Sequence, residues 1–184
     1  MRKRKCKSCG AKYTPERPLQ TVCSNFQCAL AQSRKRQEKA RRAQTRSQKL
    51  AMRTKGEWLK LAQTEFNAFI RLRDRNRSCV SCGHDGARQM HAGHYRPVGG
   101  LGANYRFTEI NCHLQCSICN NHKSGSLTTY RTELIKRIGL DLVEWLEVDR
   151  PPLKWTIEEI KAIRKYYKDA SRAMMTTAGE AEPF

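Results

Sequence analysis

The pattern of apolar residues predicts helices in the second and last thirds of the chain. From Glu57 onward, apolar residues recur three and four positions apart, which is the spacing of one buried helix face. The same spacing returns between 130 and 138, where Gly139 is expected to end the helix, and again between 142 and 146, before Pro151-Pro152. The buried face of the first of these helices is predicted to consist of Trp58, Leu61, Ala62, Phe66, Phe69 and Ile70.

The last helix has the clearest start signal. Thr156 and Glu159 have the spacing of a capping box, in which each side chain accepts a hydrogen bond from the other residue's backbone N–H. We expect the tail from 176 to 184, which has no periodicity, to be frayed. The predicted buried stripe of this helix is Ile157, Ile160, Ile163 and Tyr167.

The middle of the chain has little regular structure in its pattern. The glycine-rich segment 97–102 predicts a loop, and short strands are expected only around Gln89 to Tyr95. A few short strands among several helices predict an α+β fold that is mostly helical.

A strongly basic segment lies between Arg34 and Lys55. It carries ten cations against the single acid Glu38, and it has no apolar stripe that could face a core. Two interpretations remain open: a solvated, partly disordered tether, or a helix that lies along phosphates, and they merge if the segment orders on binding. The second interpretation predicts DNA-binding residues at Arg34, Lys35, Arg36, Lys39, Arg41, Arg42 and Arg46.

Length and charge narrow the function classes. A chain of 184 residues has room for one ordinary domain plus an appendage, or for two small domains, which excludes a large multidomain enzyme. Its 36 Lys and Arg against 17 Asp and Glu give a net charge of +19, which makes nucleic acid the expected partner. No run approaches the roughly 20 apolar residues of a membrane span, so we expect a cytoplasmic protein with no membrane partner.

The cysteines predict two zinc sites. Thiols stay reduced or bind metal in a reducing cytosol, and eight of the nine cysteines fall into four close pairs. A gap of two residues lets a tight turn direct two sulfurs at one ion, whereas unliganded thiols would require four coincidental pairings. Cys112 stands alone and is interpreted as a small buried residue. The two predicted sites are Cys6, Cys9, Cys23 and Cys28, and Cys79, Cys82, Cys116 and Cys119.

These signals divide the chain into four segments. The predicted division is an N-terminal zinc knuckle at 1–30, a basic helical linker at 31–55, a zinc-stabilised domain at 56–150, and a C-terminal helix with its tail at 151–184.

The residues between the cysteines of the second site resemble the HNH, or ββα-metal, nuclease motif. His91-Ala92-Gly93-His94 follows Cys82, Asn111 precedes Cys116 by five positions, and Asn120 follows Cys119 directly. The resemblance implies a small zinc-stabilised ββα-metal core of the treble-clef type. It also implies catalytic roles for His94 as general base, Asn111 as a brace of the hairpin and Asn120 as a ligand of the catalytic cation, with Lys123 as a basic DNA contact.

One position departs from the HNH pattern. The residue before the base is commonly an acidic metal ligand, and here it is Gly93. His91 is the nearest substitute ligand, but it shares a face with His94 only if the backbone bends at Gly93, so His122 is held in reserve. Taken alone, His94 would be interpreted as a packing histidine or a zinc ligand, and only the combined spacing favours catalysis.

A wider resemblance covers nearly the whole chain. The segments Asn67-Ala68-Phe69-Ile70-Arg71, Cys79-Val80-Ser81-Cys82-Gly83, Ala92-Gly93-His94-Tyr95-Arg96 and His122-Lys123-Ser124-Gly125 are similar to the bacteriophage lambda NinG (Rap) family of recombination endonucleases. The likeness implies a phage endonuclease, in the infected bacterial cell, that hydrolyses branched DNA such as Holliday junctions and D-loops with Mg²⁺ or Mn²⁺. Symmetric resolution of a four-way junction suggests a homodimer.

Two other function classes fit part of the sequence. A non-catalytic zinc-finger protein that assists recombination by binding DNA fits the cysteines and the charge. An RNA-binding zinc protein fits the charge and the first knuckle, but it leaves His94, Asn111 and Asn120 without a role.

Overall fold

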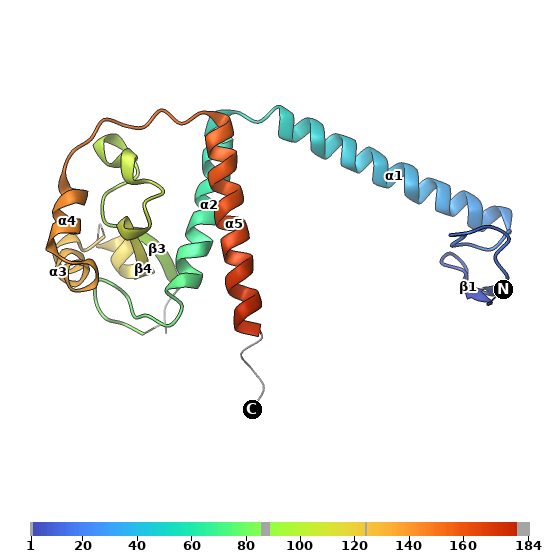
Figure 1. Cartoon of the computed structure of the whole chain (residues 1–184), viewed down its shortest axis with the longest axis horizontal. Helices are drawn as coiled ribbons and strands as arrows, with labels where there is room; N and C mark the ends of the chain where they lie inside the picture. The colour runs from blue at the N-terminus through green and yellow to red at the C-terminus, as the bar shows by residue number, and fades with distance from the viewer. Residues whose placement is uncertain (1, 86–88, 124, 180–184) are drawn as a thin grey trace. The chain divides into compact units, whose positions relative to one another are not determined.

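The computed structural model describes residues 2–85, 89–123 and 125–179, and the chain forms two compact units, Met1–Arg53 and Thr54–Phe184 (Figure 1). The first unit combines the cysteine knuckle with the basic segment, and the second combines the middle region with the last helix. The described residues are mostly helical, with two small antiparallel sheets, which confirms the α+β class. No helix in the described part of the chain is long and apolar enough to cross a membrane.

The first unit is a small hairpin followed by one long helix. Strands β1 (Arg4–Lys5) and β2 (Lys12–Tyr13) pair antiparallel, and helix α1 spans Phe26–Ala51. The helix starts before the predicted linker boundary at 31, and the side chain of Asn25 accepts the N–H of Gln27 at 2.8 Å and caps the first turn. The basic segment is therefore helical, as one of its two interpretations predicted.

Two long helices lie side by side in the second unit (Figure 1). Helix α2 (Lys55–Arg73) begins at a capping box of Thr54 and Glu57, and α5 spans Ile157–Gly179. Their predicted apolar faces meet: the ring of Tyr167 lies 4.9 Å from that of Phe66 and 5.2 Å from that of Phe69. The prediction of a frayed tail was wrong for 176–179, which continue α5, and 180–184 lie outside the described residues.

A two-stranded sheet packs beside α2. Strand β3 (Met90–His94) pairs antiparallel with β4 (Cys112–Cys116) in an unbroken register from Met90↔Cys116 to His94↔Cys112. Between them, part of the predicted glycine-rich loop is the 3₁₀ helix η1 (Gly100–Tyr105), and a second short turn, η2, spans Glu109–Asn111.

The remaining elements cover the sheet and complete the core. A short π-helical turn, η3 (Ile118–His122), follows β4, and the helices α3 (Leu127–Ile138) and α4 (Leu140–Glu147) are separated at Gly139, whose φ is +87°. Their buried faces form a core cluster with the knuckle and η1, consisting of Val80, Tyr95, Tyr105, Tyr130, Leu134, Val143 and Leu146.

A partly buried ion pair at the end of α2 is hydrogen-bonded to β4. Arg73 donates from Nε and Nη2 to the two carboxylate oxygens of Asp74 at 2.8 and 2.9 Å, and the N–H of Leu114 donates to the same carboxylate at 3.1 Å. Burial alone would raise the pKa of Asp74, but the bonds from His113 and Arg73 outweigh it and hold that pKa well below its usual range. The sheet is thus held to α2 through charge as well as apolar contact.

Candidate functional site

The first cysteine cluster gathers all four predicted residues. The Sγ atoms of Cys6, Cys9, Cys23 and Cys28 lie within 4.8 Å of one another. The backbone N–H groups of Ser8, Cys9 and Cys23 donate to Sγ of Cys6 at 3.4, 3.5 and 3.4 Å. These bonds, that of Cys9 foremost, lower the pKa of Cys6 to about 6, which favours the thiolate that a metal binds.

The second cluster joins the knuckle, the end of β4 and η3. Cys79, Cys82, Cys116 and Cys119 place their Sγ atoms within 4.8 Å of one another. The knuckle ends at Gly83, whose φ of +69° is the left-handed conformation expected for a glycine after a cysteine turn. Both clusters therefore have the ligands and spacing that could hold zinc, while the predicted lone residue, Cys112, is fully buried.

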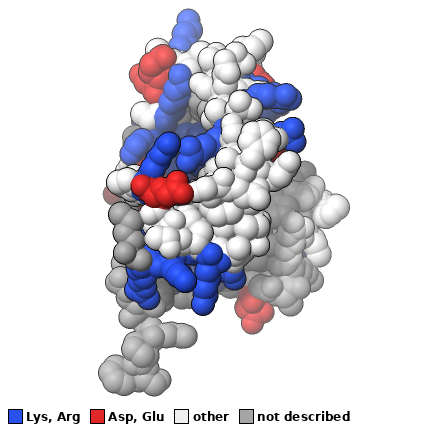
Figure 2. All heavy atoms as spheres, turned by 90° about the vertical axis from the view of Figure 1, so that its right-hand side faces the viewer, with Lys and Arg blue, Asp and Glu red and all other residues white. Residues whose placement is uncertain are grey.

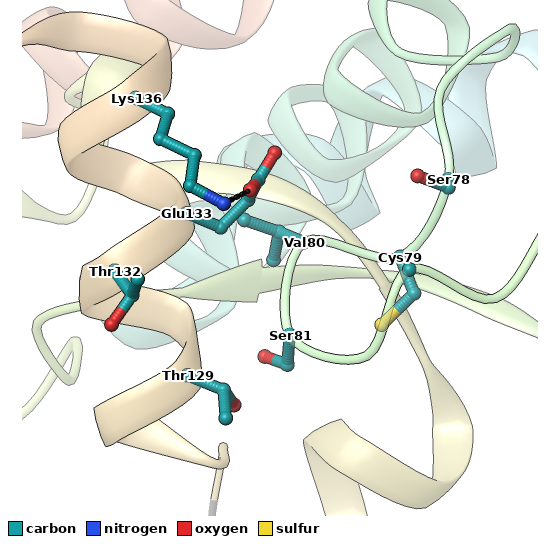
Figure 3. A pocket seen from close by; sticks show the side chains of 9 residues that line it. Ser78, Cys79, Val80, Ser81, Thr129, Thr132, Glu133 and Lys136 are labelled. Atoms are coloured by element: carbon teal, nitrogen blue, oxygen red, sulfur yellow. Dashed lines mark ion pairs between the residues drawn. The ribbon is translucent and has the colours of Figure 1, made fainter.

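A pocket of about 280 Å³ lies between the second knuckle and α3 (Figure 3). Hydroxyl groups of Ser78, Ser81, Thr129 and Thr132 line it. Its one cation, Lys136, lies 3.3 Å from Glu133, so this positive charge is already paired. The pocket lies beside the second cysteine cluster, since Cys79 belongs to both.

His94 is held at the end of β3. Its Nε2 lies 3.1 Å from the carbonyl oxygen of Arg106, its Nδ1 lies 3.6 Å from Sγ of Cys112, and its ring lies 5.7 Å from that of Phe66. Since a carbonyl can only accept, Nε2 carries the proton and Nδ1 keeps the basic lone pair. Burial lowers the pKa of His94 to about 4, so the imidazole is neutral at physiological pH.

Asn111 ties together the loop that leaves β3. The residue is fully buried, and its Oδ1 accepts the N–H of Arg96 at 2.7 Å. Its Nδ2 donates to the carbonyl oxygens of Arg96 and Tyr105, both at 3.1 Å. Every polar group of the amide is used within the protein, so Asn111 positions the loop and has no group left for a substrate.

His91 and Asn120 meet on the other side of the sheet. The Nδ2 atom of Asn120 lies 3.3 Å from Nδ1 of His91, whereas His122 is exposed at the end of η3. Because β3 stays extended through Gly93, His91 and His94 point to opposite faces of the strand. The structure thus brings His91, and not His94, next to the predicted helix ligand.

Gly93 is glycine for a steric reason. A Cβ atom at this position would lie 2.1 Å from Oε1 and 2.9 Å from Cβ of Gln115. The carbonyl oxygen of Gly93 also accepts the hydroxyl of the buried Tyr130 at 2.9 Å, which fixes the strand. The acidic ligand of the HNH pattern therefore has no room here.

The side chain of Gln115 fills the space that Gly93 leaves. Its Nε2 donates to Oγ of Ser81 and to the carbonyl oxygen of Gly125, both at 2.7 Å, and these two acceptors fix which end of the amide faces Gly93. The remaining atom, Oε1, is buried without a hydrogen-bond partner. Gln115 also pairs with His91 across the sheet, so a free amide oxygen lies on the same face as His91.

The seven predicted DNA-binding residues of α1 are all exposed. In the face shown in Figure 2, blue Lys and Arg side chains are widespread and red acidic ones are few. Positions 35, 39, 42, 46 and 49 follow steps of four and three along α1, so their side chains share one face of the helix. We call Lys35, Lys39, Arg42, Arg46 and Lys49 the basic stripe.

Lys123 lies in the second unit beside the metal cluster. It is exposed and lines a pocket of about 510 Å³ with Ser126, Thr128 and Thr129. Ser81 also lines this pocket, and a cation with four hydroxyl groups is suited to a phosphate.

Sequence reasoning missed Gln115 and Tyr130 as parts of this site. Both act on Gly93 from other elements, so no local spacing reveals them. The glycine at the acidic position was the available signal, because a glycine within a strand often marks a close approach by another group.

Comparison with known proteins identifies the family. The chain matches the family described as "Bacteriophage Lambda NinG protein" over residues 1–176. It is 40% identical over 198 residues to "Protein ninG" of Escherichia phage lambda, and 38% identical over 196 residues to "Protein ninG" of Escherichia phage 933W, with 97% of both chains covered in each case. No solved structure matches the chain. The protein belongs to the bacteriophage lambda NinG family.

Proposed function

We propose that the protein is a metal-dependent, structure-specific DNA endonuclease that acts on branched recombination intermediates such as Holliday junctions and D-loops. The observation that carries the proposal is the environment of His94, a neutral imidazole whose tautomer is set by the carbonyl of Arg106. The location in the cytoplasm of an infected bacterium and the homodimer are parts of the same proposal.

His94 is proposed to accept the proton of the attacking water. The Arg106 carbonyl holds Nε2–H and leaves the lone pair of Nδ1 for the water. In this structure Nδ1 lies 3.6 Å from Sγ of the fully buried Cys112, a weak donor, and the proposal requires the attacking water to take its place as the partner of Nδ1. A pKa of about 4 makes a weak base, and the negative charge of a bound phosphate would bring it closer to the optimum near neutral pH.

The residues on the opposite face fit a divalent cation. Gln115 has an amide oxygen and His91 an imidazole nitrogen on this face, and the Asn120 amide, whose Nδ2 now lies 3.3 Å from Nδ1 of His91, would turn to present its oxygen to the cation. Two amide oxygens and an imidazole suit Mn²⁺ somewhat better than Mg²⁺. The orphaned Oε1 of Gln115 supports the fit, because a buried acceptor without a partner is costly unless a ligand satisfies it. A bound cation would neutralise charge on the phosphoryl and leaving oxygens.

The base and the cation ligands lie on opposite faces of β3. In the proposal they therefore approach the scissile phosphate from different sides. Both faces meet along the outer edge of β3, because β4 pairs with only one edge in this two-stranded sheet. We place the phosphate along that outer edge. The tetrathiolate clusters take no part in the chemistry, because four cysteines fill a tetrahedral zinc and leave no open position.

DNA binding is assigned to the basic stripe of α1 and to Lys123. The stripe presents five cations along one face of a helix of 26 residues, which spans about 39 Å at 1.5 Å per residue. Its charges would follow phosphates without reading sequence. Branch preference rests on the resemblance to the family's recombination endonucleases.

A second function is favoured by one observation. Both ring nitrogens of His94 already have partners within the protein, and the ring packs on Phe66, as in a packing histidine. This arrangement suits a non-catalytic zinc protein that assists recombination by binding DNA.

Cleavage of a four-way junction, a fork and a linear duplex, side by side in Mg²⁺ and in Mn²⁺, separates the two functions. The nuclease proposal predicts metal-dependent nicks in the branched substrates and little cleavage of the linear duplex. Tight binding of all three substrates without nicks in either metal would favour the accessory protein.

A further inference from the structure

A second cationic surface in the first unit is formed by residues outside α1. A pocket of about 480 Å³ is lined by Arg2, Lys3, Arg4 and Arg17, together with Pro15 and Pro18. The acid next to this group, Glu16, accepts the hydroxyl of Ser24 at 2.9 Å. Four cations around one hollow make a site for phosphates.

An exposed apolar side chain belongs to the same loop as the lining residues Arg17 and Pro18. Leu19 directly follows the lining residue Pro18, and 85% of its surface is exposed. Its φ of +64° is the left-handed conformation, which is rare for a bulky residue. A leucine that is both strained and almost fully exposed does not serve packing within the described part of the chain.

Gln20 holds the loop in this shape. Its Oε1 accepts the N–H of Glu16 at 2.7 Å and that of Arg17 at 3.3 Å, and its backbone carbonyl accepts the hydroxyl of Tyr13 at 2.6 Å. The Nε2 of Gln20 donates to the carbonyl of Val22 at 2.9 Å. A strained backbone persists only where surrounding contacts hold it, as in ligand-binding loops. The hydrogen bonds of Gln20 hold this loop in the conformation that leaves Leu19 exposed.

We propose that Leu19 is a wedge that covers the end of a base stack where branched DNA strands diverge, while Arg2, Lys3, Arg4 and Arg17 bind the flanking phosphates. This inference rests on the proposed action on branched DNA. An intact duplex offers a leucine little apolar surface, whereas a branch point exposes the face of a base pair. Apolar side chains flanked by Arg and Lys insert between base steps in other DNA-binding proteins.

The test measures binding of the full-length, zinc-loaded protein, without added Mg²⁺ or Mn²⁺, to a four-way junction and to a linear duplex. Leu19→Gly removes the side chain and relieves the backbone, so folding should be preserved. We expect it to weaken junction binding about 10-fold and duplex binding less than 2-fold, with an unchanged salt slope. Arg17→Ala should instead reduce the salt slope by about 0.9 on the duplex, because it removes a phosphate contact.

Met52→Ala is the matched control, because Met52 is 82% exposed at the opposite end of α1. It should leave both affinities unchanged. A 2-aminopurine base at the branch point should change its fluorescence with the wild type and not with Leu19→Gly. Equal losses on junction and duplex, or no loss at all, would overturn the inference. Because no cleavage is measured, a failure of the nuclease proposal would leave this result standing.

Discussion

The amide oxygen of Gln115 lies 2.1 Å from the point where a side chain at position 93 would begin. The side chain of Gln115, on the neighbouring strand, occupies the space that a side chain at position 93 would need. Only glycine therefore fits at position 93. The pair removes the acidic ligand of the HNH pattern and places an unpaired amide oxygen on the same face as His91.

An acidic side chain at position 93 should destabilise the fold unless Gln115 is shortened as well. We expect Gly93→Asp to lower the free energy of unfolding by about 3 kcal/mol, because overpacking a tight contact typically costs 1–3 kcal/mol and the new carboxylate is poorly solvated. The double variant Gly93→Asp/Gln115→Ala should recover part of this loss in urea denaturation. Gly99→Asp is the control, since a Cβ at Gly99 meets nothing within 4 Å, and it should change stability by less than about 0.5 kcal/mol. Additive effects of the two substitutions would contradict the pairing.

The two cysteine clusters should each hold one zinc ion. We expect metal analysis to find two zinc ions per chain, and Cys116→Ser to lose one of them and unfold the second unit, because structural zinc contributes of order 10 kcal/mol to folding. Cys112→Ser, which alters a buried cysteine outside both clusters, should keep both ions. Finding one zinc or none in intact wild-type protein would remove the two-site account.

Stability should fall in mild acid because of His94. Burial lowers its pKa to about 4, against about 6.5 in the unfolded chain, so the unfolded state binds more protons between these values. The contribution is therefore complete above pH 6.5 and is lost as the pH falls towards 4, and it amounts to roughly 3 kcal/mol. His94→Gln should flatten the dependence of unfolding free energy on pH over this interval. An unchanged slope would mean that His94 is not held neutral by burial.

The basic stripe should contribute more to DNA binding than the cations that flank it on α1. Replacing Lys35, Lys39 and Arg46 by Ala should reduce the salt slope of duplex binding by up to about 2.7, since each phosphate contact contributes about 0.9. Replacing Arg34, Arg36 and Arg41 removes the same charge from the flanks of the helix and should have a smaller effect. If both triple variants change the slope equally, α1 does not bind DNA through one face.

The sequence predicted those parts of the fold that depend on local spacing. The apolar faces of α2 and α5 were found because burial on one side of a helix leaves a repeat of three and four residues, and the cysteine pairs were found because a knuckle is local. Strand β4 was missed for the opposite reason. Its apolar residues Cys112, Leu114 and Cys116 alternate with His113 and Gln115, but all five are buried, and the partners that satisfy the polar residues are distant in sequence.

The polar residues of β4 also show why the site was only partly predictable. Buried His113 lies 3.5 Å from Asp74, and buried Gln115 bonds to Ser81 and Gly125, so partners distant in sequence satisfy them. The resemblance to the HNH motif implied a hairpin around His94, but which face each histidine occupies depends on the register of β3 with β4. Residues that act through tertiary contacts leave no mark on the local pattern.

Cation binding should depend on the face of β3 opposite to His94. We expect Asn120→Ala to impair junction cleavage, and excess Mn²⁺ to restore part of the activity, because the variant weakens the cation site rather than the base. His91→Ala should raise the Mn²⁺ requirement in the same way, while the exposed His122→Ala should not. A raised requirement in His122→Ala with none in His91→Ala would move the ligand to His122.

The most direct test of the nuclease account is single-turnover cleavage of a four-way junction by His94→Ala. The account predicts a loss of roughly 10²- to 10⁴-fold in rate, the usual contribution of a general base, and excess Mn²⁺ should not restore it. Junction affinity should stay within about 2-fold of the wild type and both zinc ions should remain, because a base acts on the transition state more than on binding. Cleavage by His94→Ala at a near-normal rate would contradict the assignment of His94 and, with it, the HNH-type mechanism.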